Sequence, residues 1–185
     1  MLRAGFDEAG LGPTLGPLVV AGFATSVTGG DQGRGPIDDL RGPLAALVGE
    51  PGARGGKLEV GDSKKIHTGP RKLARVERTA LATVAWIHGV VPATVAELFG
   101  LVVDTSHEVP GDRKAPWWAS LDEALPIVCQ PLDGDAVAHQ VRRAGEAAGR
   151  LPLWYRADVL SAARINRELV AEEARVDGTK NTWAT

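Results

Sequence analysis

The sequence predicts an α/β protein that opens with two short strands and continues with helices. Residues 2–6 and 18–24 are apolar and β-compatible, and between them residues 9–17 hold three glycines and two prolines, which break regular structure. From Thr68 the apolar residues recur at three- and four-residue steps until Gly89, which is the spacing of an amphipathic helix. We therefore expect a strand, a tight loop, a strand and then a helix.

The other elements are expected from the same kinds of pattern. Residues 28–56 are rich in Gly, Pro and Asp, which favours a surface loop with one short helix near Pro43–Val48. Leu58–Gly61 is expected to form a further strand. Three more helices are expected, at Thr94–Gly100, Ala136–Ala148 and Ser161–Ala174.

Length and composition exclude several classes of protein. The 185 residues suggest one domain, and 44% hydrophobic with 24% charged residues argues against disorder. The net charge of −2 excludes binding to nucleic acid by bulk electrostatics, so any such contact must be local. Cys129 is the only cysteine, which excludes an internal disulfide framework and a thiolate zinc cage. No apolar run is long enough to span a bilayer and no signal peptide opens the chain, so a cytoplasmic location is expected.

Two adjacent carboxylates, Asp7 and Glu8, stand where the first strand is expected to end. Neighbouring residues of an ideal strand point to opposite faces, so both acids turn toward one cleft only if the strand ends or bulges at Asp7. Carboxylates are hard ligands suited to Mg²⁺ or Mn²⁺, and the glycines that follow let backbone N–H groups approach a phosphate or sugar. The alternative is a solvated Asp-Glu pair that starts a Gly-Pro turn.

Two segments resemble motifs of the type 2 ribonuclease H family. In that family an Asp-Glu-Ala-Gly-x-Gly-Pro segment ends the first strand, and the matching residues here are Gly5-Phe6-Asp7-Glu8-Ala9-Gly10-Leu11-Gly12-Pro13. The family's next landmark is an Asp-Ser-Lys-Lys segment before a helix, and it is matched by Asp62-Ser63-Lys64-Lys65. The two motifs lie within residues 3–85, and no secure match follows them.

The resemblance implies a ribonuclease H-like fold, in which helices flank a mixed five-stranded sheet. On this reading residues 1–185 form a single domain, with residues 28–56 and 86–150 as insertions. Such proteins cleave the RNA strand of RNA–DNA hybrids, or cut at ribonucleotides in duplex DNA, with two divalent metals held by four carboxylates. The expected partner is that nucleic acid, without a membrane or an obligate protein partner.

The resemblance also assigns roles to seven residues. Asp7 and Glu8 would be catalytic ligands of Mg²⁺ or Mn²⁺. The backbone that contacts the ribose 2′-OH would be lined by Gly10, Leu11 and Gly12. Phosphates would meet Lys64 and Lys65, which open a segment (residues 62–78) with six Lys/Arg and two acids. The alternative for that segment is the solvated face of an amphipathic helix.

The match departs from the family pattern in two places. Leu11 stands where the family has an arginine, which removes a charged phosphate contact. The third and fourth carboxylates have only Asp133 and Asp158 as candidates, and Pro131 fits a central strand badly. The other reading is that the later motifs lie beyond Thr185 and that the chain is a partial copy, with an open sheet edge.

Two further functions compete with a metal-dependent ribonuclease. The first is a nucleic-acid-binding remnant, which retains the lysines and the glycine loop without a full carboxylate set. The second is a phosphate-binding kinase or ATPase of the same broad fold, which also opens with a strand, an Asp and a glycine turn. Glu8 directly after Asp7, together with Pro13 and Pro17, argues against the second.

Overall fold

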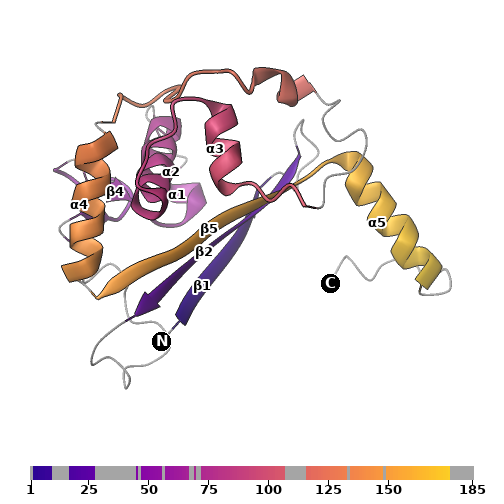
Figure 1. The fold of residues 1–185 in the computed structure, drawn as a ribbon, viewed down its shortest axis with the longest axis horizontal. Helices are drawn as coiled ribbons and strands as arrows, with labels where there is room; N and C mark the ends of the chain where they lie inside the picture. Colours follow the sequence, from indigo (N-terminus) through magenta and orange to yellow (C-terminus); the bar gives the residue numbers. More distant parts are fainter. Residues whose placement is uncertain are drawn as a thin grey trace.

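The computed structural model describes a mixed α/β arrangement, which confirms the expected fold class at that level (Figure 1). The residues it describes are 2–9, 17–27, 45, 47–55, 57–66, 69, 72–106, 116–132, 134–147 and 149–175. The strands are β1 (Leu2–Ala9), β2 (Leu18–Val27), β3 (Val48–Gly49), β4 (Leu58–Glu59) and β5 (Arg150–Leu160). The helices are α1 (Ser63–Ile66), α2 (Lys72–His88), α3 (Val95–Val102), α4 (Gly134–Ala147) and α5 (Ala162–Arg175), with the 3₁₀ helix η2 at Pro116–Ser120.

The main sheet has three strands in the order β1-β2-β5, and both pairings are antiparallel. β1 and β5 therefore run in the same direction, so the ends of both lie beside the start of β2. Residues that pair directly across strands share a face of the sheet. Glu8, Val20 and Asp158 thus form one row across the sheet, and Asp7, Ala21 and Ala157 form the next row on the opposite face.

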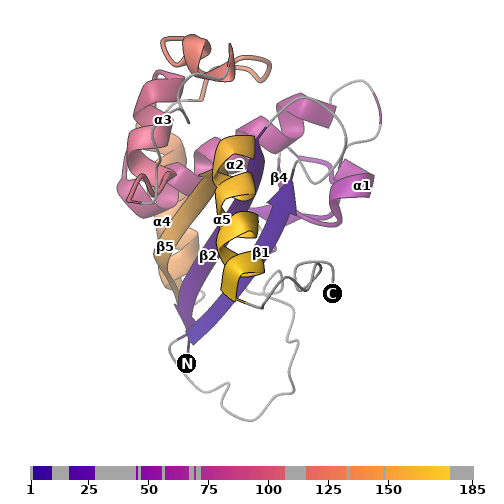
Figure 2. The ribbon, with the colours of Figure 1, turned by 90° about the vertical axis from the view of Figure 1, so that its right-hand side faces the viewer.

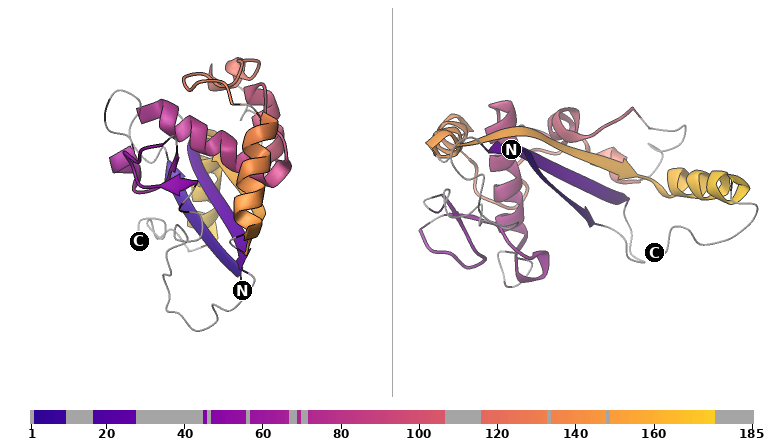
Figure 3. Two further views of the ribbon diagram at one scale, coloured as in Figure 1. Left: turned by 90° about the vertical axis from the view of Figure 1, so that its left-hand side faces the viewer. Right: turned by 90° about the horizontal axis from the view of Figure 1, so that it is seen from below.

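Helices cover one face of this sheet, which we call the covered face. The core there consists of Leu47, Leu58, Ala82, Trp86 and Val141. Phe23 of β2 packs on Trp86 of α2, with ring centroids 5.9 Å apart. Figures 2 and 3 show α2 and α4 together on this side of β1, β2 and β5. The opposite face, which carries Phe6, Gly22 and Arg156 in one row, is called the open face below.

Helix α2 forms where the apolar periodicity predicts it. Its buried residues Leu81, Val84 and Ala85 recur at three- and one-residue steps along the side that faces the core. Gly89, the expected stop, adopts a left-handed backbone with φ of 74° directly after His88. The helix expected at Thr94–Gly100 is α3, and the Thr94 side chain caps it by accepting a hydrogen bond from the Glu97 N–H.

Two expectations about secondary structure are wrong or incomplete. The described residues near Pro43–Val48 do not form the short helix that was expected there. They form a turn and the start of β3, in which Val48 pairs in parallel with Leu58 of β4. No part of β5 was expected from the sequence. Its strand signal lies in alternate apolar residues, namely Leu151, Leu153, Tyr155, Ala157 and Val159.

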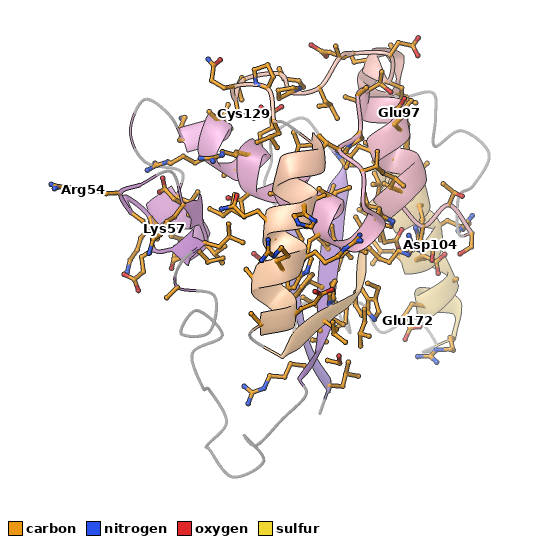
Figure 4. All side chains as sticks on the ribbon, turned by 60° about the vertical axis from the view of Figure 1, so that its left-hand side comes forward. Arg54, Lys57, Glu97, Asp104, Cys129 and Glu172 are labelled. Carbon is orange, nitrogen blue, oxygen red and sulfur yellow. The ribbon has the colours of Figure 1, made fainter. Side chains whose placement is uncertain are left out.

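The segment after η2 is attached to α2 through one carboxylate. Glu77 accepts hydrogen bonds from the backbone N–H groups of Ile127, Val128 and Cys129, at 2.5, 2.8 and 2.6 Å. Burial raises the pKa of Glu77, but the three N–H donors outweigh it and the pKa is lowered overall. Burial and the Glu77 charge together raise the pKa of the Cys129 thiol to about 11, so this thiol (Figure 4) stays protonated at neutral pH.

We expect Glu77→Gln to lower the stability of the chain by about 1–3 kcal/mol at pH 7, because three backbone donors lose a charged acceptor. This corresponds to a fall in the melting temperature of about 2–4 °C per kcal/mol for a chain of this size. Because folding lowers this pKa, the stabilisation is present above the unfolded value of 4.5 and is lost as the pH falls through the folded value.

Thermal unfolding measured from pH 7 down to pH 3 checks this expectation. The two proteins should converge in stability at the acid end, and Glu146→Gln on the exposed side of α4 should match the wild type throughout. Equal stability of the wild type and Glu77→Gln at pH 7 would show that this carboxylate does not hold the segment.

Candidate metal and nucleic-acid site

The acid pair lies near the end of β1, but the strand does not end at Asp7. The ladder with β2 continues through Glu8 and Ala9, which pairs with Val19, and no bulge interrupts it. The expectation that both carboxylates turn toward one cleft is therefore wrong. Two more ladder pairs preserve the pleat, so Asp7 lies on the covered face and Glu8 on the open face.

Both acids are exposed to solvent. Asp7 Oδ1 accepts a hydrogen bond from the Glu8 backbone N–H at 3.0 Å, which holds this carboxylate close to its own strand. Among the described residues only β2 pairs with β1, so the outer edge of β1 carries no described strand. Gly10, Leu11 and Gly12, which the resemblance places against the ribose, lie outside the described residues.

A groove of about 470 Å³ lies on the open face and reaches Val20 and Asp158, which share a row with Glu8. It is lined by Phe6, Val20, Gly22, Asp104, Trp154, Arg156, Ala157 and Asp158. The rings of Phe6 and Trp154 meet over β2 with centroids 5.7 Å apart and planes tilted by 46°. Asp104 reaches the groove because its backbone N–H donates to the Ala157 carbonyl, which fastens the segment after α3 to β5.

Gly22 is what allows the two rings to meet. A Cβ at this position would lie 2.7 Å from atoms of both Phe6 and Trp154. We expect Gly22→Ala to destabilise the chain by about 1 kcal/mol, at the low end for overpacking because the exposed Phe6 ring can swing aside. The fluorescence of Trp154 should change with it. Unchanged stability and an unchanged emission spectrum would show that the ring pair does not form in solution.

The structure brings Asp158 into the same row as Glu8, on the far side of Val20. Both carboxylate oxygens of Asp158 accept hydrogen bonds from the guanidinium of Arg164, at 2.5 and 2.8 Å. This bidentate pair is half-buried, with 12% of the Arg164 side chain and 31% of the Asp158 side chain exposed. Asp158 is thus engaged by a cation of the chain itself. Asp133, the other candidate, lies outside the described residues.

The two lysines of the second motif lie on α1, which the structure places on the same side of the sheet as α2 (Figures 1 and 3). Asp62 begins this turn, because its Oδ1 accepts from the Lys64 N–H at 2.8 Å. Ile66 is buried and its carbonyl accepts from the Arg75 guanidinium, so α1 is fixed to α2. Lys64 and Lys65 remain exposed, and they lie on the covered side, to which Asp7 also points.

Carboxylate oxygens are the right kind of ligand for Mg²⁺ or Mn²⁺, so Asp7 and Glu8 fit such an ion by chemistry. The arrangement of side chains around them does not by itself form a metal site. Within the ranges that the structure describes, no three side chains of His, Cys, Asp or Glu come together as a metal site. An ion held by both acids would need the last residues of β1 to leave the ladder.

Comparison with known proteins adds no support to the resemblance. No family model matches the chain, and neither a curated protein nor a solved structure matches it. The resemblance to type 2 ribonucleases H therefore depends on the two sequence motifs. In the described part of the chain, no helix combines the length and the apolar character that crossing a bilayer requires.

Proposed function

We propose that the chain carries the first two metal-binding carboxylates of a ribonuclease H-like endonuclease. Its substrate would be the RNA strand of RNA–DNA hybrids, or ribonucleotides within duplex DNA, and its cofactor Mg²⁺ or Mn²⁺. The observation that carries the proposal is the placement of the acid motif. Asp7 and Glu8 are exposed on an edge strand, at the end of the sheet where β2 begins and β5 ends.

The sheet topology supports a ribonuclease H-like arrangement as part of this proposal. Three antiparallel strands in the order β1-β2-β5 are followed directly by a helix, and β1 has an outer edge without a described partner. A mixed five-stranded sheet would need further strands parallel to β1, and this edge is where they would pair. Asp7 and Glu8 would then lie inside the sheet rather than at its border.

The charge distribution supports contact with nucleic acid on the covered side. Residues 62–78 carry six cationic and two anionic side chains, a local charge of +4 in a chain whose net charge is −2. Arg75 pairs with Glu59 at 3.3 Å, and Lys64 and Lys65 are exposed at the surface of the same segment. A lysine pair on the same side as Asp7 would hold phosphates next to the metal-binding end of β1.

A second candidate is a protein that binds nucleic acid without cleaving it. It is favoured by Asp158, because both oxygens of this carboxylate already accept hydrogen bonds from the Arg164 guanidinium, which would compete with an ion shared with Glu8. The opposite orientations of Asp7 and Glu8 favour it as well. Affinity for a hybrid would then fall with salt but would need neither metal nor Asp7.

One experiment separates the two functions. Wild-type chain and Asp7→Asn are each incubated with a labelled RNA–DNA hybrid, with and without Mg²⁺ or Mn²⁺, and both binding and cleavage are recorded. Cleavage that requires metal and Asp7 supports the nuclease. Binding that is equal in both proteins, with no cleavage in either, supports the second candidate and contradicts the first.

A further inference from the structure

A pair of aromatic rings lines the groove on the open face. Phe6 of β1 and Trp154 of β5 both approach Gly22 of β2, whose missing side chain leaves room for the two rings. The Phe6 side chain is 70% exposed, although it lies on an ordered strand next to another ring. An exposed aromatic side chain on the face of a sheet is a typical stacking surface for unpaired nucleic-acid bases.

The charged groups around these rings balance one another. Asp158 is paired with Arg164, so together they add no net charge to the groove. The other charged side chains that line the described groove are Asp104 and Arg156, one negative and one positive. Arg156 is held in place because its Nη1 donates to the Leu101 carbonyl at 2.6 Å. A neutral, planar occupant with polar atoms at its edge suits this lining better than a phosphate or a cation does.

Two other kinds of occupant fit the groove less well. A lipid chain would cover the carboxylates and the guanidinium with hydrocarbon, and a buried charge without a polar partner is costly. A proline-rich peptide docks on aromatic grooves, but it offers carbonyl acceptors and few N–H donors. The carboxylates of Asp104 and Asp158 only accept hydrogen bonds. Cytosine, adenine and guanine carry amino groups, which donate to such acceptors.

The groove also has the size and the position for one base. Its volume of about 470 Å³ is typical of a small-ligand site. Val20 and Asp158 line it and share a row with Glu8, whereas Glu8 itself does not line it. Phe6 and Glu8 are two residues apart on one strand, which separates them by about 7 Å. A base on Phe6 therefore leaves the acid pair uncovered, and the backbone attached to that base can reach Glu8.

We propose that the groove binds an unpaired base of a single-stranded RNA or DNA segment, which stacks on Phe6 beside Trp154. The choice of nucleic acid rests on the function proposed above, through the row shared with Glu8, but the contact itself requires neither metal nor cleavage. Lys64 and Lys65 lie on the covered side and would contact phosphates. Stacking on the open face therefore adds a contact that depends on the base rather than on the charge of the backbone.

The test compares two labelled single strands of about ten nucleotides, one with cytosine at every position and one with an abasic site at every position. Fluorescence anisotropy of each strand is measured in EDTA with the wild type and with Phe6→Ala. The wild type should bind the cytosine strand at least about fivefold more tightly than the abasic strand, because only the former can stack. Phe6→Ala should lose this preference and bind both strands about equally.

Three variants serve as controls. Phe6→Tyr keeps an aromatic ring and should keep the preference, as should Leu2→Ala, which removes an exposed side chain of the same strand and face outside the groove. Lys64→Glu/Lys65→Glu should weaken binding of both strands by the same factor. A wild type without preference for the cytosine strand, or a preference that Phe6→Ala retains, would overturn the proposal. Because EDTA removes the metal, a failure of the nuclease proposal would leave this result unchanged.

Discussion

Asp7→Asn is expected to abolish metal-dependent cleavage of an RNA–DNA hybrid while leaving the fold intact. The amide has the shape of the carboxylate but not its charge, so it is a poor ligand for Mg²⁺ or Mn²⁺. A metal contributes several kcal/mol to the transition state, and the loss of about 4 kcal/mol lowers the rate about 10³-fold. Initial rates on an end-labelled hybrid at saturating metal measure the effect.

The controls for this experiment lie on the same chain. Glu8→Gln should lower the rate by a comparable factor, whereas Asp122→Asn, at an exposed acid in the turn after η2, should not. Circular dichroism establishes that all variants are folded. Cleavage by Asp7→Asn at the wild-type rate, or no cleavage by a folded wild type with ample metal, would refute the nuclease proposal for this chain.

The double substitution Lys64→Glu/Lys65→Glu is expected to weaken hybrid binding about tenfold or more at low salt. Each lysine that neutralises a phosphate releases counterions, and each such contact adds about 0.9 to the slope of log affinity against log salt. Loss of two contacts should therefore lower that slope by nearly two. Fluorescence anisotropy of a labelled hybrid across a salt series gives both quantities.

Arg142→Glu/Arg143→Glu provides the matched control, because it reverses two exposed charges on α4 and changes the net charge by the same amount. The control should shift affinity slightly through the overall field and leave the slope nearly unchanged. If both double variants weaken binding equally, α1 does not form the phosphate contact and the cation-rich segment acts only through its net charge.

Local patterns predict the elements whose formation depends on nearby residues. The periodicity of α2, the glycine after it and the position of α3 are all visible in the sequence, and all occur. β5 is not visible in the same way, because Pro152 and Arg156 interrupt its apolar run. Its pairing with β2 also contains a register shift beside Ala24. Tertiary pairing therefore decides this strand, and local propensity does not.

In the candidate site, too, local patterns predict some features, whereas tertiary pairing decides the others. Spacing identifies Asp7 and Glu8 as a pair, but their orientation depends on how far the ladder with β2 extends, and it extends to Ala9. The alignment of Glu8 with Asp158 depends on the register of two strands more than a hundred residues apart in the chain. The spacing of residues along the sequence does not reveal that register. The engagement of Asp158 by Arg164 depends on where α5 starts after β5, and the sequence shows this only as a helix boundary.

A divalent cation bound by both Asp7 and Glu8 is expected at the end of β1, where the last residues must leave the ladder with β2 to bring the two carboxylates together. Titration with Mn²⁺ while backbone amide signals are recorded by NMR tests this claim directly, since the ion broadens signals of nearby nuclei. Broadening should be centred on residues 7–9 and should disappear in Asp7→Asn. Signals of residues 7–9 that stay sharp while others broaden, or broadening that persists in Asp7→Asn, would contradict the claim.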